Sequence, residues 1–206
     1  MRTGILGGTF DPIHIAHLHA GEIALHQAQL DEMLFMPVGD PWQKADRSVT
    51  LAPHRLEMVR LATKDIEGFD VDGREIERDG PTYTIDTLLS FPDDQELFLV
   101  LGADAALGLP TWRRAVDVLE RSGILVVPRP GVDSAAVLQV VPQAVFLDMA
   151  ELEVSGTEIR AMAHRGDPFR FLVTERVHEY IVEHALYTED PGADSVMGPP
   201  GQEESS

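Results

Sequence analysis

The sequence predicts an α/β protein, a doubly wound, Rossmann-like parallel sheet with helices on both faces. Short segments that are apolar along their whole length alternate with longer amphipathic segments. Strands covered by helices on both faces have this continuous apolar character. The first apolar segment also ends in two glycines, followed by a turn and a helix-like segment. Because such sheets bind ligands beyond the carboxyl ends of their strands, we expect a binding site at this first turn.

The hydrophobic pattern predicts the elements in order. Strands are expected in short apolar runs, at 2–6, 33–37, 97–101, 124–127 and 145–147. Helices are expected where apolar residues recur at helical spacing, at 15–27, 53–64, 83–90, 115–121, 155–164 and 174–186. Residues 69–78 are expected to be extended, and 39–50 to form a polar loop. The apolar positions expected to face the core from the first two helices are Ile15, Leu18, Ile23 and Leu25, then Leu56, Val59 and Leu61.

The composition predicts one domain over residues 1–187 and an acidic tail over 188–206. The chain has 206 residues, of which 44% are hydrophobic and 25% charged, which suits a single sizeable core. No internal repeat or linker divides it. From Glu189 onward there are five acidic residues and no basic one, among prolines, glycines and serines. We expect this tail to be disordered.

Charge and cysteine content restrict the partners. The net charge is −19, which argues against a nucleic-acid polymer as partner. The chain has no cysteine, so disulfides and thiolate metal sites are excluded and a cytoplasmic location is expected. No apolar run approaches the roughly 20 residues that span a bilayer, and the first residues do not resemble a signal peptide. We therefore expect no membrane partner.

The strongest chemical pattern lies in the first seventeen residues. It reads Gly7-Gly8-Thr9-Phe10-Asp11-Pro12, followed by His14 and His17. Two glycines allow close approach of a ligand to the backbone, and the two histidines fall at the start of the following helix, where free N–H groups attract anions. The pattern favours phosphate contact. A structural role and a metal site remain alternatives, although no acidic third ligand is spaced as in His-Glu-x-x-His.

Two rival nucleotide motifs are missing from this region. Dinucleotide binding requires Gly-x-Gly-x-x-Gly after the first strand, and the Gly7-Gly8 pair lacks this spacing. A Walker A lysine motif is absent as well. A nicotinamide-dependent oxidoreductase and a P-loop kinase are therefore disfavoured.

Further candidates lie after the later strands. Lys44 occupies a Gly/Pro-containing loop and could reach a phosphate or remain solvated. Thr82, next to Tyr83, is expected to cap the helix that follows. Trp112 could stack on a flat ring or belong to the core. Ser155 and Glu158 have the spacing of a capping box, which would explain that segment without any ligand.

The motif from Gly7 to His17 resembles the signature of the nucleotidylyltransferase superfamily, and within it the nicotinate-nucleotide adenylyltransferases. The segment Gly80-Pro81-Thr82-Tyr83-Thr84 resembles a string found in those enzymes and not in their pantetheine-phosphate or cytidylyl relatives. The resemblance extends from Gly4 to about Tyr187. Two positions depart from the family pattern: Ala16 replaces the usual glycine between the histidines, and Gly156 replaces a hydroxyl residue in Ser155-Gly156-Thr157.

The resemblance implies a role for each matching residue. The residues expected to contact ATP are Gly7, Gly8, Thr9, Phe10, His14, His17, Ser155, Thr157 and Arg160. Those expected to contact the pyridine nucleotide are Lys44, Thr82, Tyr83, Thr84, Gly102, Asp104, Trp112 and Arg129. Catalysis is expected from His14, His17, Lys44 and Arg160. In the family, backbone amides of the Gly-Pro-x-Tyr-Thr segment hold the pyridine carboxylate, and a tryptophan stacks on the ring.

The implied reaction is adenylyl transfer from ATP to nicotinate mononucleotide, a step of NAD biosynthesis that gives deamido-NAD and pyrophosphate. Mg²⁺ is expected on the ATP phosphates, without metal ligands from the protein. A homo-oligomer is left open. The alternatives are an enzyme for nicotinamide mononucleotide or another phosphomonoester, a non-catalytic nucleotide sensor, and a structural or interaction protein.

Overall fold

A computed structural model describes residues 1–39, 49–78, 80 and 82–188. Its centre is a six-stranded sheet in the order β3-β2-β1-β4-β5-β6. Every neighbouring pair of these strands is parallel. The strand order reverses direction between β1 and β4, which is the switch point where doubly wound sheets bind ligands. The predicted fold class is confirmed.

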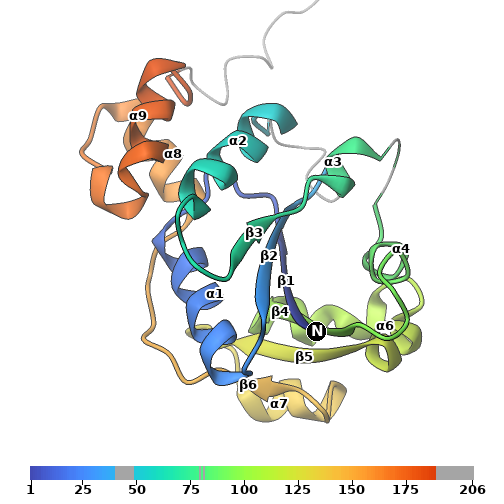
Figure 1. The fold of residues 1–206 in the computed structure, drawn as a ribbon. Helices are drawn as coiled ribbons and strands as arrows, with labels where there is room; N and C mark the ends of the chain where they lie inside the picture. The colour runs from blue at the N-terminus through green and yellow to red at the C-terminus, as the bar shows by residue number, and fades with distance from the viewer. Residues whose placement is uncertain (40–48, 79, 81, 189–206) are drawn as a thin grey trace, which may run out of the picture.

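The described elements alternate along the chain (Figure 1). The strands are β1 (Arg2–Gly8), β2 (Glu32–Pro37), β3 (Phe69–Val71), β4 (Glu96–Gly102), β5 (Ser122–Val127) and β6 (Val145–Phe146). The first helices are α1 (Ile15–Gln27), α2 (Ala52–Thr63), α3 (Arg74–Glu77) and α4 (Thr84–Leu88). The later helices are α5 (Ala103–Gly108), η2 (Leu109–Thr111), α6 (Ala115–Arg121), α7 (Ser134–Val140), α8 (Gly156–Arg165), η3 (Arg170–Leu172) and α9 (Glu175–Glu183).

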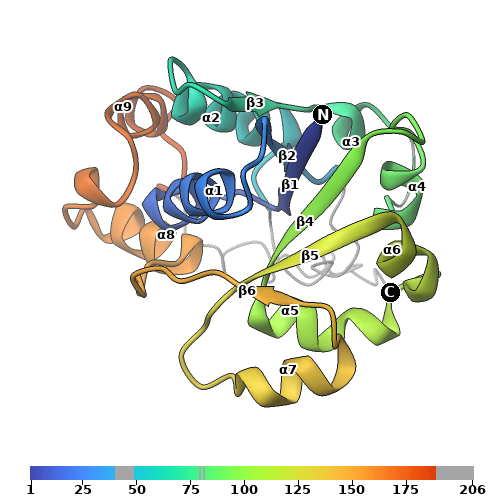
Figure 2. The same cartoon turned by 60° about the horizontal axis from the view of Figure 1, so that its bottom comes forward.

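Two hydrophobic clusters cover the two faces of the sheet. Successive strand side chains alternate between them, so Ile5 packs into one cluster and Leu6 into the other, as the two-residue period of a strand requires. The cluster with Leu6 contains residues of α1, α2, α8 and α9. The cluster with Ile5 contains residues of α4, α5, α6 and α7. Figure 2 shows α5 and α7 across the sheet from α1 and α2.

The sequence pattern located most elements to within two residues, but it failed in four places. Residues 69–78 are not one extended segment, because β3 ends at Val71 and α3 begins at Arg74. Neither α5 nor α7, with six and seven residues, was anticipated, although α6, also with seven residues, was. The helix predicted at 174–186 ends at Glu183.

The inward face of α1 also differs from the prediction. Its buried residues are Ala20, Gly21 and Ala24, while the larger apolar residues of the helix are only partly buried at its sides. A Cβ atom at Gly21 would lie 2.6 Å from the ring of Phe35. Small residues therefore let this helix approach the sheet closely, which sets the position of the histidines at its start.

Candidate functional site

A cleft of about 190 Å³ opens at the carboxyl end of β1. Its walls come from the turn between β1 and α1, the start of α8, and the loop after β5. The lining residues are Thr9, Phe10, Asp11, Pro12, His14, His17, Val49, Arg129, Val154, Ser155, Gly156, Thr157 and Arg160. The cleft thus joins segments that are far apart in the sequence, at the edge of the sheet where the fold predicts ligand binding.

The first turn is built around Phe10. The glycines before it are not in left-handed conformations, and β1 continues through Gly8. Phe10 itself has the positive φ, at 47°, and its buried ring lies 3.2 Å from the position that a Cβ on Gly8 would occupy. Gly8 therefore leaves space for this ring. The Phe10 ring also meets His17 edge-on, with centroids 5.0 Å apart.

The two histidines of the motif are stacked at the start of α1. Their ring centroids are 3.7 Å apart, and the backbone N–H of His14 donates to Nδ1 of His17 over 3.3 Å. His14 is buried, and within the described part of the chain its Nδ1 has no hydrogen-bond partner. The pair presents a compact imidazole surface at a helix N-terminus, where an anion is favoured.

His14 is an uncharged imidazole at neutral pH. Burial, reinforced by the positive charge of Arg129, lowers the pKa of His14 from 6.5 to about 4. To any ligand in the cleft it therefore presents a neutral hydrogen-bonding group. A phosphate brought next to it would offset the charge of Arg129 and favour the protonated form.

Arg160 reaches the cleft from α8. Its Nη1 donates to the backbone carbonyl of Asp11 over 2.6 Å and lies 3.9 Å from the Asp11 carboxylate. Its Nη2 donates to Oγ1 of Thr157 over 3.4 Å. The side chain is about a quarter exposed, so the guanidinium is held from one side and open to the cleft on the other. Ser155 accepts the Glu158 N–H as the helix cap, which is the Ser155 half of the predicted capping box.

The structure explains the glycine at position 156. A Cβ there would lie 2.7 Å from the Asp11 carbonyl oxygen and 3.2 Å from its carbon. These are rigid backbone atoms, so a larger residue would move α8 away from the first turn. Gly156 thus permits the close approach that brings Arg160 to Asp11, and its lack of a hydroxyl is the consequence of that packing.

Arg129 connects this cleft to the end of β4. Its Nε lies 3.7 Å from Oδ1 of Asp104 in the first turn of α5, and it also lines the cleft beside the histidines. A Cβ at Gly102 would lie 2.7 Å from that same Asp104 oxygen, so the glycine leaves space for the carboxylate. The residues predicted at the ends of β4 and β5 are therefore neighbours.

The aromatic residues predicted to face the pyridine lie on the other side of the sheet from α1. Tyr83 and Trp112 are partly buried against one hydrophobic cluster, and the guanidinium of Arg113 lies 4.5 Å from the Tyr83 ring centroid. The capping prediction for Thr82 is wrong. Helix α4 begins at Thr84, its N-cap residue is Tyr83, and no side chain caps it.

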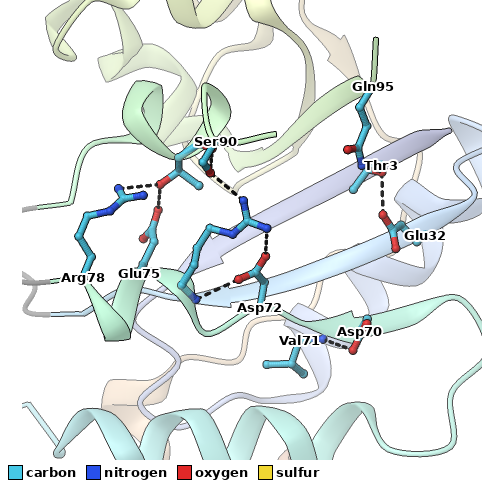
Figure 3. A network of polar contacts seen from close by, with 11 residues as sticks. Thr3, Glu32, Asp70, Val71, Asp72, Glu75, Arg78, Ser90 and Gln95 are labelled. Carbon is cyan, nitrogen blue, oxygen red and sulfur yellow. Dashed lines mark hydrogen bonds and ion pairs between the residues drawn. The ribbon is translucent and has the colours of Figure 1, made fainter. Parts of the chain in front are cut away.

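A polar network holds α4 against α3 (Figure 3). The buried carboxyl of Glu75 accepts the hydroxyl of Thr87 over 2.6 Å, and Arg78 donates to the same hydroxyl over 3.4 Å. Burial raises the pKa of Glu75 above its ordinary value. Arg74 binds Ser90 and Asp72 nearby. This network fixes the last turn of α4 and the residues just after it against α3.

Arg55 has a structural role that the sequence did not reveal. From the sequence, Arg55 follows His54 at a predicted helix start, with a phosphate contact, helix capping and a surface salt bridge as the alternatives, yet only 1% of it is exposed. Its guanidinium donates to the carbonyls of Thr50, Thr9 and Gly39 over 2.9, 2.8 and 2.7 Å. It thus ties the loop after β1 to the loop after β2. No local signal distinguishes such an arginine from an exposed one in the sequence.

The described structure brings the predicted phosphate residues together. Thr9, Phe10, both histidines, Ser155, Thr157 and Arg160 line one cleft, joined by Arg129. Gly7 and Gly8 end the strand that leads into it. Thr82, Tyr83 and Thr84 lie at the start of α4 and Trp112 follows η2, while Gly102 ends β4 and Asp104 lies in the first turn of α5. Lys44 lies outside the described residues.

The cleft suits phosphate oxygens better than a bare metal ion. It offers imidazoles, guanidinium groups and hydroxyls. In the described ranges, no group of three histidine, aspartate or glutamate side chains could hold a metal. A search of the same residues finds no helix with the length and apolar character that crossing a membrane requires.

Comparison with known proteins identifies the class. The sequence profile described as Cytidylyltransferase-like matches residues 5–162. A solved structure of Plasmodium falciparum nicotinic acid mononucleotide adenylyltransferase, complexed with NaAD, has the same fold with a TM-score of 0.74, at 18% identity over 91% of this chain and 97% of that one. The chain is therefore an enzyme of the nucleotidyltransferase class.

Curated relatives narrow the assignment. A probable nicotinate-nucleotide adenylyltransferase of Desulfitobacterium hafniense is 39% identical over 90% of this chain and 95% of its own length. A probable nicotinate-nucleotide adenylyltransferase of Dehalococcoides mccartyi is 40% identical over 91% of this chain and 97% of its own length. The chain belongs to the nicotinate-nucleotide adenylyltransferase family, as the sequence motifs predicted. Enzymes of this ATP-using family generally need a divalent metal.

The lowered pKa of His14 predicts a specific loss of stability in acid. Its pKa lies below the unfolded value, so stability is present above pH 6.5 and is lost as the pH falls toward 4. Between pH 7 and 5 this one residue should cost roughly 2 kcal/mol of unfolding free energy. Urea unfolding at both pH values measures the loss, which should be smaller by that amount in His14→Asn. An equal loss in both proteins would contradict the neutral, buried imidazole.

Arg55→Lys should lower the unfolding free energy by about 3 kcal/mol, because one ammonium cannot replace three buried guanidinium contacts. Denaturant unfolding provides the measurement. The matched control is Arg60→Lys on the same helix, whose exposed side chain lies 3.9 Å from Glu57, and which should change stability by less than about 0.5 kcal/mol. Similar losses in both variants would contradict the role given to Arg55.

Proposed function

We propose that this chain transfers the adenylyl group of ATP to nicotinate mononucleotide, giving deamido-NAD and pyrophosphate. Membership of the nicotinate-nucleotide adenylyltransferase family supports this reaction. The supporting observation within the chain is the cleft at the end of β1, which gathers the stacked histidines, Arg160 and Arg129. Both substrates carry phosphates, and the imidazole and guanidinium groups of this cleft are suited to bind phosphate oxygens.

The chemistry needs positioning and charge neutralisation more than a strong base. The attacking group is a phosphate oxygen, and a phosphomonoester has its second pKa near 6, so it is largely dianionic at pH 7. What raises the barrier is the approach of two anions. Groups fixed in advance around the reacting phosphorus lower that barrier by alignment and electrostatics. Neutral and cationic hydrogen-bond donors fit this task.

The proposal gives each phosphate-side residue a role. His14 and His17 donate to phosphate oxygens at the reacting phosphorus and the departing pyrophosphate. Arg160 adds a fixed positive charge, and the hydroxyls of Ser155 and Thr157 stand beside it at the start of α8. Gly7, Gly8, Thr9 and Phe10 shape the backbone around the nucleotide. Lys44 contributes a further cation from the loop after β2, outside the described residues.

Magnesium is the metal we propose for the reaction. The donors of the cleft, which are mostly nitrogen and hydroxyl groups, suit an ion that arrives on the ATP phosphates and keeps water ligands. When bound, Mg²⁺ neutralises part of the triphosphate charge.

The absence of cysteine in all 206 residues suits a reducing, cytoplasmic setting for this enzyme.

The second substrate is proposed to lie toward the ends of β4 and β5. Thr82, Tyr83 and Thr84 contribute the segment that leads into α4, where free backbone N–H groups could meet the pyridine carboxylate. Trp112 offers a flat apolar surface for the ring. Asp104, Gly102 and Arg129 lie close to one another, and Arg129 also lines the cleft at the end of β1, so the proposal puts the ribose and its phosphate beside them.

The direct test is pyrophosphate release from ATP with each mononucleotide. The proposal expects turnover with nicotinate mononucleotide and much slower turnover with nicotinamide mononucleotide. Equal rates would contradict the specificity for the carboxylate, and ATP binding without pyrophosphate release would indicate a nucleotide sensor.

His17→Ala should lower kcat by about two orders of magnitude or more, because it removes a donor from the charge that develops in the transition state. Steady-state pyrophosphate release gives kcat, and thermal unfolding checks that the fold is retained. His26→Ala at the other end of the same helix is the matched control and should keep the full rate. Unchanged kcat in His17→Ala would remove this residue from the mechanism.

Trp112→Ala should raise KM for nicotinate mononucleotide about tenfold and leave KM for ATP nearly unchanged. The reason is the loss of an aromatic contact worth roughly 1 kcal/mol beyond its buried area. Initial rates with each substrate varied in turn separate the two constants. Equal increases in both KM values would count against stacking on the pyridine.

A further inference from the structure

The carboxylate of Asp11 is the meeting point of three distant segments. The residue is buried, with 8% of its surface exposed. Its Oδ1 accepts the hydroxyl of Tyr187 over 2.8 Å, and its Oδ2 accepts the backbone N–H of Thr50 over 3.3 Å. Asp11 therefore joins the first turn, the segment before α2 and the end of the described chain.

The same aspartate also holds Arg160. The backbone carbonyl of Asp11 accepts Nη1 of Arg160 over 2.6 Å, and Oδ2 faces that nitrogen at 3.9 Å. The direction of the guanidinium therefore depends on how firmly the Asp11 turn is fixed. Since Arg160 lines the cleft, any movement of Asp11 would move a cation at the proposed phosphate site.

We propose that Tyr187 is a positioning residue for ATP binding, acting through Asp11 on Arg160. Its hydroxyl anchors one oxygen of the Asp11 carboxylate, and the anchored turn keeps the Arg160 guanidinium directed at the cleft. Tyr187 itself does not line the cleft, so it acts without touching the nucleotide. This inference rests on the proposed binding of ATP at Arg160.

Tyr187 is suited to this task because it remains a donor. Burial, together with the negative charge of Asp11, raises the pKa of its phenol well above the ordinary value. The hydroxyl therefore stays protonated at any pH at which the protein would be assayed. The side chain of Thr50 also hydrogen-bonds this hydroxyl, and the sulfur of Met58, a weak acceptor, lies 3.9 Å away on α2. The Asp11 carboxylate is the charged acceptor among these neighbours.

The test is the dissociation constant of MgATP, measured by equilibrium dialysis without the second substrate. Tyr187→Phe removes a single oxygen atom and should weaken MgATP binding roughly tenfold, while binding of nicotinate mononucleotide is unchanged. Tyr180→Phe is the matched control. It also removes a hydroxyl near the end of the chain, one that bonds His54 over 2.8 Å, and it should leave both constants unchanged.

A double-mutant cycle with Arg160→Lys separates positioning from general loosening. In that background the Tyr187→Phe change should have almost no further effect on MgATP binding, because the guanidinium through which it acts is gone. An equal weakening in both backgrounds, or an equal effect on both substrates, would overturn the proposal. The cycle measures only the binding of MgATP. A failure of the proposed reaction would be detected separately, because the unaltered protein would then release no pyrophosphate.

The Gly156→Ala variant provides a second test of the proposal, in which Tyr187 is unchanged. The added Cβ would meet the Asp11 carbonyl at 2.7 Å and push α8, with Arg160, away from it. The same selective loss of MgATP binding is expected, at unchanged binding of nicotinate mononucleotide. If Gly156→Ala binds MgATP as the unaltered protein does, the Asp11 contact does not position Arg160 and the proposal fails.

Discussion

The arrangement of this site depends on buried contacts between guanidinium groups and backbone carbonyls. Arg55 binds carbonyls in the loops after β1 and β2, and Arg160 binds the carbonyl of Asp11 in the turn before α1. Phe10 and Ile13 bury part of this turn in the core, and polar bonds fix the loop backbone around them. A planar guanidinium with several donors can fix more than one carbonyl at once. The sheet supplies the common edge, and these two arginines make the loops at that edge rigid.

The gathering of basic residues in one cleft also bears on the acidic composition of the chain. A chain with a net charge of −19 repels the anions that it is proposed to bind. In the structure, Arg129, Arg160 and the two histidines of the first motif line one cleft. The cleft is therefore richer in basic groups than the chain as a whole. Burial and the charge of Arg129 lower the pKa of His14, so this imidazole adds no positive charge to the cleft at neutral pH.

The fold could be predicted from the sequence because strands buried on both faces and helices of ten or more residues have distinct periods. The first turn and the start of α8 were identifiable because glycines, histidines and hydroxyls recur there in a known arrangement. Helices α5 and α7 were not predicted, although α6, of similar length, was. The contacts of Arg55 and Tyr187 could not be recognised either, because Arg55 binds three backbone carbonyls from separate loops and Tyr187 binds a side chain 176 positions away, which no local pattern encodes. The burial of Gly21 against Phe35 also reflects packing rather than periodicity.

The bond between Tyr187 and Asp11 joins residues separated by 176 positions. Translation makes Asp11 early and Tyr187 late, after all six strands, so a nascent chain can form its sheet before this bond is available. A truncated product that lacks Tyr187 would thus retain every strand of the sheet and yet lack the hydroxyl that holds the Asp11 carboxylate.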